Sequence, residues 1–586
     1  MDIERSADRS RPVAELHPNE RLKDESRQLR GTIAQGLADP VTGAIRDPDT
    51  QLSKFFGIYQ QDDRDLRDAR RRARLEPRYQ FMVRVRMPGG VCSTAQWLAL
   101  DALARDTADG SLRLTTRQTF QFHGVRKRDL KRHVKAIAAA GLDTLGACGD
   151  VNRNVISAAN PLRSPAHAAA NELAQRIGAH LLPRTGAYRE IFLEEDGVRP
   201  GDPVAGPDAT GGEEEPFYGR TYLPRKFKIA IAVPPQNDVD VYAHDLGYVA
   251  IVERGHLAGY DVTVGGGMGM THGATATFPR VADVVGFCRP EEALSVAEHT
   301  VAIQRDFGHR KDRAHARFKY TIEDRGLDWF RAELARRMGR PLDPARGFRF
   351  ESTGDENGWR EDSAGLWHYT LFVENGRVRD RPDQRLMSAL RAVARVHGGS
   401  FALTTNQNLI IAGVAAGERG AIDALLHEHG VGERPGRSGL RLNSIACVAL
   451  PTCGLAMAES ERYLPTLLDR LEPLLAAASL TQAPITIRMS GCPNGCSRPY
   501  LAEIALVGKA PGRYNLYLGA SARGDRMSAL YRENLDEAAI LQHLGSLLQR
   551  YASERIGDER FGDFTVRIGA VPAVERSRDF QHLRAT

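Results

Sequence analysis

The feature that most constrains the fold of this chain is an internal repeat. Residues Leu114–Val125 read LTTRQTFQFHGV and residues Leu403–Val414 read LTTNQNLIIAGV, so six of the twelve positions are identical. A helix-like stretch precedes each segment, and another follows it at 131–141 and 421–430. A repeat of this size predicts two copies of one structural unit. The order strand, helix, strand, helix in each copy predicts a ferredoxin-like half domain.

A second pair of similar segments, Gly259–Gly266 and Arg513–Ala520, follows the first pair in the same order. Apolar strand sequences resemble one another by chance, but two repeats in one order make duplication the better interpretation. We therefore predict a duplicated α+β fold with pseudo-twofold symmetry and a cofactor site between the halves. The predicted units are an N-terminal extension (1–65), two ferredoxin-like half domains (66–148 and 346–432) and two cofactor-binding α/β domains (149–345 and 433–586).

Composition and charge exclude several classes of protein. The 586 residues carry 80 basic and 74 acidic side chains, a net charge of +6. This excess is small for the length, whereas nucleic-acid binders concentrate charge, and it favours an anionic cofactor, an anionic substrate or an acidic protein partner. The N-terminus lacks the apolar core of a signal peptide, and no apolar run is long enough for a membrane span. We expect a cytoplasmic protein with an exposed linker at 195–219.

Four of the seven cysteines form two close pairs, with five residues between Cys447 and Cys453 and three between Cys492 and Cys496. Four thiolates are what a cubane iron–sulfur cluster requires, and soft sulfur ligands also select zinc. The five-residue gap fits a zinc knuckle poorly, and neither gap matches the spacing of bacterial ferredoxins. Glycine and proline flank the second pair, so that backbone can approach a bulky cluster. The other three are expected to pack as small buried hydrophobes: Cys92, Cys148 and Cys288.

These motifs resemble the signature of the siroheme-containing sulfite and nitrite reductases. The likeness rests on Cys447-x5-Cys453 and on Gly491-Cys-Pro-Asn-Gly-Cys496, and it extends over nearly the whole chain. Further matching segments are YQQDDRD (59–65), RVRMPGG (84–90), TTRQTFQFH (115–123), NRN (152–154), PRKFK (224–228), GKAPGR (508–513) and FGDFT (561–565). Within that family the chain is most similar to haemoprotein (β) subunits that work with an NADPH-dependent flavoprotein.

The resemblance implies a six-electron reduction of sulfite to sulfide, in sulfur assimilation and cysteine biosynthesis. It implies that all four paired cysteines bind a [4Fe–4S] cluster and that Cys496 is also the axial ligand of siroheme. Siroheme carries carboxylates and sulfite is a dianion, so both need Arg and Lys. The residues implied to face the substrate are Arg84, Arg153, Lys226 and Lys228. The residues implied to contact siroheme are Arg113, Arg117, Gln121 and His123 and, beside the bridging cysteine, Asn494 and Arg498.

The periodicity of the basic residues has two interpretations. Polar and basic residues alternate with apolar ones from Arg113 to His123, so that a strand would present them on one face. Lys226 and Lys228 likewise share a face of a strand that continues into Ile229. Ordinary amphipathic strands with solvated faces would show the same pattern, but the cysteine motif favours a convergent anion site. The basic run 310–319 could reach a tetrapyrrole carboxylate or form a solvated helix face.

The electron donor is expected to be a separate protein. The glycine run Gly265–Gly269 lacks the Gly-x-Gly-x-x-Gly pattern opening a helix and is expected to be a tight turn near the cofactor. Overall similarity favours a flavoprotein, whereas the segment 496–500 resembles ferredoxin-dependent relatives. A siroheme nitrite reductase is the alternative within the family, although Lys226 and Lys228 favour sulfite. A non-catalytic zinc or structural-thiolate protein is the alternative outside the family.

Overall fold

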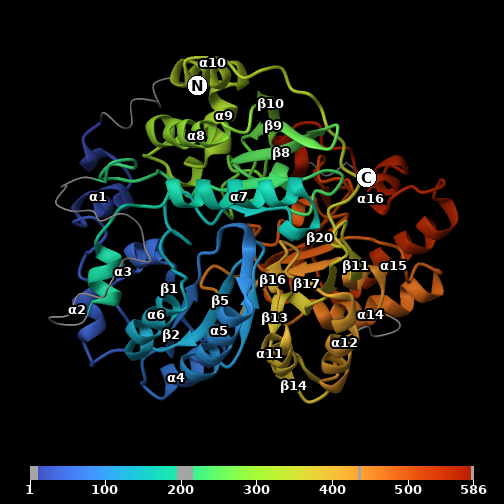
Figure 1. Cartoon of the computed structure of the whole chain (residues 1–586), viewed down its shortest axis with the longest axis horizontal. Helices are drawn as coiled ribbons and strands as arrows, with labels where there is room; N and C mark the ends of the chain where they lie inside the picture. The colour runs from blue at the N-terminus through green and yellow to red at the C-terminus, as the bar shows by residue number, and fades with distance from the viewer. Residues whose placement is uncertain (1–10, 195–214, 433–436, 582–586) are drawn as a thin grey trace.

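The computed structural model describes residues 11–194, 215–432 and 437–581. Within these ranges the chain forms four five-stranded sheets and a two-stranded hairpin of β14 (Asp380–Arg381) and β15 (Gln384–Arg385). Helices cover the sheets, and the blue N-terminal half domain stands beside its yellow-to-orange counterpart (Figure 1). Most of the linker expected at 195–219 lies outside the described residues. None of the described helices has both the length and the apolar character of a membrane span.

Two of the sheets are the ferredoxin-like half domains. The first has the order β1 (Ile58–Asp62), β2 (Tyr79–Arg84), β5 (Phe120–Val125), β4 (Leu112–Leu114) and β13 (Arg377–Val378). The second has the order β11 (Gly358–Glu361), β12 (Trp367–Leu371), β17 (Leu409–Val414), β16 (Ser400–Leu403) and β3 (Val91–Ser93). The first sequence repeat therefore occupies the same two strands of each sheet, β4 and β5 in one and β16 and β17 in the other. The predicted α+β duplication is confirmed.

The two half domains exchange edge strands. Strand β13 comes from the second half of the chain and pairs with β4 of the first, while β3 comes from the first half and pairs with β16 of the second. Their helices correspond as well: α5 (Thr94–Thr107) and α6 (Leu130–Ala139) in one, α11 (Leu386–Val396) and α12 (Arg419–Glu428) in the other. Because each sheet needs a strand from its counterpart, the two halves are held in one relative orientation.

The other two sheets form the cores of the α/β units. One has the order β6 (Ile156–Ser157), β7 (Ile229–Ala232), β8 (Leu246–Glu253), β9 (His256–Val264) and β10 (Asp283–Cys288); the other has the order β18 (Ser444–Ala446), β19 (Ile487–Ser490), β20 (Ile504–Ala510), β21 (Arg513–Leu518) and β22 (Ala529–Leu535). In both, the first two strand pairs are parallel and the last two antiparallel. The second sequence repeat lies on β9 and β21, the fourth strand of each sheet.

Helices pack on these sheets through apolar stripes of helical period. In α14 (Leu464–Ala477), the buried residues Leu464, Leu467, Leu468, Leu471 and Leu475 follow the i, i+3, i+4 spacing. The helices of the α/β units are α7 (Pro165–His180), α8 (Ala293–Phe307), α9 (Phe318–Arg325), α10 (Leu327–Met338), α13 (Gly439–Leu442), α15 (Glu537–Glu554) and α16 (Phe561–Arg567). The remaining helices belong to the N-terminal segment: α1 (Pro18–Glu25), α2 (Ile33–Ala38), α3 (Asp47–Leu52) and α4 (Arg67–Arg72).

The N-terminal segment packs through buried charges rather than apolar contacts alone. Glu20 on α1 is buried and pairs with Lys23 at 2.6 Å and with Arg310 of the first α/β unit. At the other end of the segment, the Arg64 guanidinium donates to the carbonyl oxygens of Cys453 at 3.2 Å and Ala456 at 2.7 Å. The segment thus contacts both halves of the duplicated core.

Trp97 on α5 is expected to be a principal contact between the half domains. Its ring is fully buried and lies 5.7 Å from that of Phe120 on β5 and 5.0 Å from that of Phe401 on β16. Replacing Trp97 with Ala should lower the free energy of unfolding by about 3–5 kcal/mol, because a large ring is lost from a packed core. Urea unfolding followed by circular dichroism would measure this loss. Trp97→Phe should cost much less, and equal midpoints for the two variants would contradict the assignment.

Candidate active site

The four paired cysteines lie in two adjacent loops at the carboxyl ends of parallel strands. Cys447 follows β18 directly and leads to Cys453, while Cys492 and Cys496 follow β19. Because β18 and β19 are parallel neighbours, their following loops meet at one sheet edge. Burial raises the pKa of the Cys447 thiol to about 12 and those of Cys453 and Cys492 to about 11. For all three thiols the next cause is the charge of Cys496, which therefore lies within electrostatic reach of each.

The donor set of this cysteine group fits an iron–sulfur cluster. All four thiols are free of disulfides, the backbone N–H of Gly491 donates to Cys447 Sγ at 3.3 Å and Asn494 Nδ2 donates to Cys492 Sγ at 3.4 Å. Such hydrogen bonds stabilise thiolate ligands. In the described part of the chain, no three His, Cys, Asp or Glu side chains are grouped as ligands of one metal ion. Four free thiols in two neighbouring loops would suit a [4Fe–4S] cluster, which takes four cysteine ligands.

Close packing around these loops explains the glycines of the motif. A Cβ on Gly491 would lie 2.5 Å from Cβ of Ala449 and 2.6 Å from the carbonyl oxygen of Ala458. Gly495 has a φ of +62°, and a Cβ there would lie 2.8 Å from the carbonyl oxygen of Met268. The loop after β19 therefore has no room for larger residues beside its sulfurs. The glycine run 265–269 meets this loop, but it is irregular backbone with a bridge at Gly267 rather than the tight turn expected from sequence.

A pocket opens beside Cys496 and is strongly cationic. Five basic side chains line it, and no acidic side chain of the described residues does. The lining residues are Thr116, Arg117, Lys226, Lys228, Ala243, His244, Met268, Gly269, Arg317, Asn494, Gly495, Cys496 and Arg498. Of the residues predicted from sequence, this pocket brings together Arg117, both lysines, Asn494, Cys496 and Arg498.

The two lysines of the pocket are the part of its lining best suited to an anionic ligand. They lie just before β7 and both face the pocket, as their alternation predicts. Among the described residues, neither ammonium group has a hydrogen-bond acceptor or an ion-pair partner. Burial lowers the pKa of Lys226 well below 10.5, and Lys228 and Arg153 lower it further. Burial likewise lowers the pKa of Lys228, followed by the charge of Arg117. Half-buried cations of this kind, without an ion-pair partner, fit an anionic ligand.

The guanidinium group of Arg117 also has donor atoms that no described residue engages. Its Nη2 donates to the carbonyl oxygen of Asn154 and, at 3.3 Å, to that of Ile229. Its Nε and Nη1 atoms are buried and have no hydrogen-bond partner within the described ranges. Burial, then the charges of Arg153 and Arg498, lower the pKa of Arg117 to about 9. The donor atoms available here match the carboxylates of a tetrapyrrole or the oxygens of a small oxyanion.

The remaining predicted siroheme contacts lie outside this pocket. The stretch from Arg113 to His123 is a hairpin, with a turn between β4 and β5, so the prediction of one strand face was wrong. The hairpin still places Arg113 opposite Gln121 in the register. Arg113 pairs with Glu461 at 2.9 Å and donates to the carbonyl oxygen of Ala446 at 2.8 Å. His123 Nε2 lies 3.4 Å from Gln121 Oε1, and His123 Nδ1 has no hydrogen-bond partner in the described chain.

The predicted substrate-facing arginines form a neighbouring group around Cys148. Arg84 Nη1 donates to Cys148 Sγ at 2.7 Å, and Arg153 donates to the carbonyl oxygen of Gly149 at 3.0 Å. Burial raises the pKa of the adjacent Tyr59 to about 12, and Cys148 contributes to the rise. Cys148 is buried as expected, but its contact with a guanidinium means that packing as a plain small hydrophobe was the wrong interpretation. Arg153 lies close enough to influence both pocket residues Arg117 and Lys226.

The basic run 310–319 is not a single solvated helix face, because most of its residues are buried or half-buried and only Lys311 and Asp312 are exposed. Arg313 pairs with Asp150 at 2.8 Å, and Arg317 pairs with Asp245 at 2.9 Å while lining the pocket. Lys319 is fully buried and donates to the carbonyl oxygens of Gly267 at 3.0 Å, Gly269 at 2.7 Å and Phe278. Sequence reasoning included Arg317 only within the basic run 310–319 that could reach a tetrapyrrole carboxylate, and it missed Thr116 as a pocket residue. A third repeat, Arg317-Phe318 against Arg560-Phe561, could have pointed to Arg317.

The duplicated fold contains two equivalent positions for such a pocket, and only one of them is strongly cationic. Ile229 pairs with Leu246 and Ile487 pairs with Ile504, and the intervening segments are equally long. Aligning the repeats gives these counterparts: Cys496 with Asp238, Arg117 with Asn406, Lys228 with Thr486 and the Arg317–Asp245 pair with Arg560–Glu503. Asp238 is buried, and burial raises its pKa to about 7. The thiolate and most of the cations thus occur at one position only.

The fold and the cysteine-lined cationic pocket define a protein of the nitrite and sulfite reductase class. Residues 73–140 and 360–429 match the model of the nitrite/sulfite reductase ferredoxin-like half domain, and residues 176–342 match that of the nitrite and sulphite reductase 4Fe-4S domain. Together these ranges cover more than half of the chain, which belongs to this family. The match to the 4Fe-4S domain lies in the first α/β unit and ends before the four cysteines, which lie in the second.

Curated relatives match over nearly the full length. The "sulfite reductase [NADPH] hemoprotein beta-component" of Afipia carboxidovorans is 55% identical over 99% of this chain and 99% of that protein. The protein of the same name from Myxococcus xanthus is 56% identical over 96% of this chain and 98% of that protein. Among solved structures, Mycobacterium tuberculosis NirA has a TM-score of 0.74 at 24% identity, covering 96% of this chain and 98% of NirA. At that identity, the likeness supports the fold alone.

Proposed function

We propose that this chain is the haemoprotein subunit of an NADPH-dependent assimilatory sulfite reductase and catalyses the six-electron reduction of sulfite to sulfide. One observation carries the proposal: Cys496 belongs to the group of four cysteines and also lines the cationic pocket. A sulfur in that position can ligate a cluster and a second iron centre at once. Full-length identity of 55% and 56% to two proteins named as this subunit supports the same activity.

The residues divide into two binding groups. Cys447, Cys453, Cys492 and Cys496 would hold a [4Fe–4S] cluster, and the cationic pocket would hold the carboxylates of siroheme with Cys496 as its axial ligand. When bound, these two groups supply the electron-transfer chemistry. Arg117 and Arg317 are suited to bind anionic carboxylates because guanidinium groups pair with them through two parallel hydrogen bonds. Of the other proposed siroheme contacts, Asn494 and Arg498 line the pocket, whereas Arg113, Gln121 and His123 lie outside its lining.

The substrate role falls to a separate set of cations. Lys226 and Lys228 would bind the oxygens of sulfite, and Arg84 and Arg153 would complete a positive shell around them. A buried ammonium with a lowered pKa gives up its proton more readily than a solvated one. The two lysines are therefore placed both to neutralise an oxyanion and to donate protons as oxygen leaves as water. A buried pair of cations also disfavours ligands without charge.

Electrons would come from a separate NADPH-dependent flavoprotein subunit, in accordance with the names of the relatives. A ferredoxin is the alternative donor. We also propose a cytoplasmic location, where a supply of NADPH and a reducing environment suit an enzyme that needs four free thiols, one of them exposed.

The test is to purify the chain after co-expression with siroheme synthesis and to measure its absorption spectrum, iron content and turnover. About five irons per chain, four in a cluster and one in a tetrapyrrole, are expected. A reduced viologen dye can replace the natural donor. Faster turnover of sulfite than of nitrite would support the proposal; the opposite preference would favour a nitrite reductase. A colourless zinc protein would refute it.

A further inference from the structure

Asp240 and Arg498 occupy equivalent positions in the two halves of the duplicated fold. Asp240 lies eleven positions after Ile229 on β7, and Arg498 lies eleven positions after Ile487 on β19. Each is followed by a short 3-10 turn, at Val241–Ala243 and Pro499–Leu501. Two counterparts related by a pseudo-twofold axis can touch each other only beside that axis. Arg498 Nε donates to Asp240 Oδ2, so this ion pair marks the line where the halves meet.

The other donors of Arg498 follow the same symmetry. Its Nη1 donates to the carbonyl oxygen of Thr116 at 3.0 Å, and its Nη2 donates to that of Thr405 at 3.1 Å. Thr116 and Thr405 are themselves counterparts in the first sequence repeat. One guanidinium therefore joins both ferredoxin-like half domains to the loop after β19. With these donors engaged by protein groups, Arg498 has little hydrogen-bonding capacity left for a cofactor.

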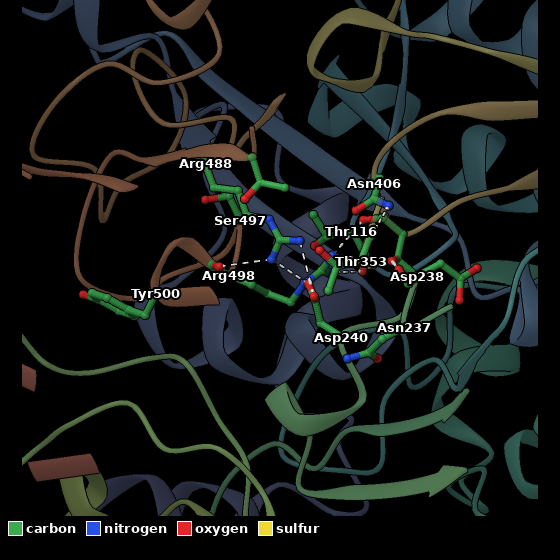
Figure 2. Close-up of polar contacts among 12 residues, drawn as sticks. Thr116, Asn237, Asp238, Asp240, Thr353, Asn406, Arg488, Ser497, Arg498 and Tyr500 are labelled. Carbon is green, nitrogen blue, oxygen red and sulfur yellow. Dashed lines mark hydrogen bonds and ion pairs between the residues drawn. The ribbon is translucent and has the colours of Figure 1, made fainter. Parts of the chain in front are cut away.

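Asp240 is the centre of this network (Figure 2). Its carboxylate is fully buried, and it accepts a second charged hydrogen bond from Arg488 Nη1 on β19 at 2.6 Å. Arg488 is also buried. Two buried guanidinium groups thus depend on one carboxylate, and its removal would leave both without a counter-charge. Such a network sets geometry more than it adds stability, because desolvation offsets much of the attraction.

The network also reaches Cys496, the cysteine that belongs both to the group of four cysteines and to the lining of the cationic pocket. Thr116 Oγ1 donates to the carbonyl oxygen of Cys496 at 3.2 Å, so the same residue that accepts from Arg498 also fixes the backbone of Cys496. Ser497, between them, is held by a 2.7 Å hydrogen bond with Ser490. Arg498 itself has a left-handed backbone, with a φ of 53°, a conformation that needs surrounding contacts to persist in a non-glycine residue.

We propose that Asp240 is a positioning residue: by orienting Arg498 at the pseudo-twofold axis, it directs the Cys496 thiolate toward both the cluster and the cationic pocket. The inference rests on the double role of Cys496 in the proposed function. It assigns to Arg498 a structural task in place of a cofactor contact. It also explains why a residue of the first half, with no place in the pocket lining, should affect a ligand of the second half.

The experiment compares the holoenzyme with Asp240→Asn, which keeps the shape of the side chain and removes its charge. Iron and siroheme content, the absorption and electron paramagnetic resonance spectra of the siroheme, and sulfite turnover are measured. We expect altered siroheme spectra, lower siroheme content and turnover reduced by about 10–100-fold, as is usual when a group supporting a metal ligand is lost. Asp240→Glu, which keeps the charge, should restore the spectra at least in part.

The matched control is Glu503→Gln. Glu503 is as deeply buried as Asp240, but its carboxylate accepts hydrogen bonds from Arg560 at 2.8 Å and from the backbone N–H groups of Thr486 and Gly562, which lie outside the Cys496 loop. It should lower the melting temperature without changing the siroheme spectra. If Asp240→Asn does not fold, Arg498→Lys takes its place, since an ammonium cannot span the carbonyl oxygens of Thr116 and Thr405 at once. Wild-type spectra and siroheme content in whichever of the two variants folds would overturn the inference, and the proposed function would survive if the wild type reduces sulfite.

Discussion

Replacing Cys496 with Ser is expected to reduce sulfite turnover to below about 1% of wild type. Loss of a group that merely supports a metal ligand already costs about 10–100-fold, and here the ligand itself is lost from two centres. Cys496 lies within electrostatic reach of Cys447, Cys453 and Cys492, so its removal disturbs the whole cysteine group. Turnover with reduced viologen, together with the iron and siroheme content of the purified variant, would measure the effect.

The matched control for this variant is Cys288→Ala. Cys288 is as free of disulfides as Cys496 and fully buried on β10, outside the pocket lining. It should keep wild-type spectra and at least half of the activity, because only a small buried side chain is trimmed. Cys496→Ser with wild-type siroheme spectra and turnover would show that some other residue bridges the two centres.

Replacing Lys226 or Lys228 with Met is expected to lower turnover by about 10²–10⁴-fold while leaving both cofactors in place, since an acid–base and charge-stabilising group is lost. The same variants should make the cofactor-free protein more stable, by about 1–4 kcal/mol, because a buried charge without a partner is removed. The two opposite effects would identify residues retained for function at a cost in stability. Turnover assays on the holoenzyme and urea unfolding of protein made without siroheme would measure them.

The pH dependence of unfolding offers an independent check on Lys226. Its pKa in the folded chain lies well below the ordinary value of 10.5, chiefly because of burial. Between these two values, the unfolded chain binds a proton that the folded chain does not, so the free energy of unfolding should rise with pH. This contribution should be complete above pH 10.5, and Lys226→Met should lack it. An identical pH profile for the two proteins would contradict the assigned environment.

Lys319 provides the matched control for both lysines. Lys319 is more deeply buried than the two pocket lysines, and its ammonium donates to three carbonyl oxygens. Lys319→Met should therefore destabilise the cofactor-free protein, because three acceptors lose their donor. If all three variants changed stability in the same direction, the distinction between partnered and unpartnered lysines would be wrong.

Much of the fold could be predicted because the sequence contains two copies of the same structural unit. The repeats at 114–125 and 403–414 implied two like units, and the paired sheets have the same strand order. One prediction from the first repeat was wrong. The alternation of polar and apolar residues continues through the turn of a hairpin, so it has the same pattern as a single strand. The exchange of β3 and β13 between half domains could not be predicted, because strands of two or three residues leave no periodic signal.

The sequence by itself determined the duplicated architecture, the four-cysteine group and the placement of Lys226 and Lys228 on one face, because these depend on local spacing and repetition. Only the tertiary structure decided which basic residues are paired with an acidic side chain and which remain available to bind an anionic ligand. Arg113 forms an ion pair with Glu461 and Arg498 forms one with Asp240, whereas the two lysines have no such partner in the described chain. The two partners of each of these ion pairs lie hundreds of positions apart in the sequence. No local pattern along the chain can therefore predict that they pair.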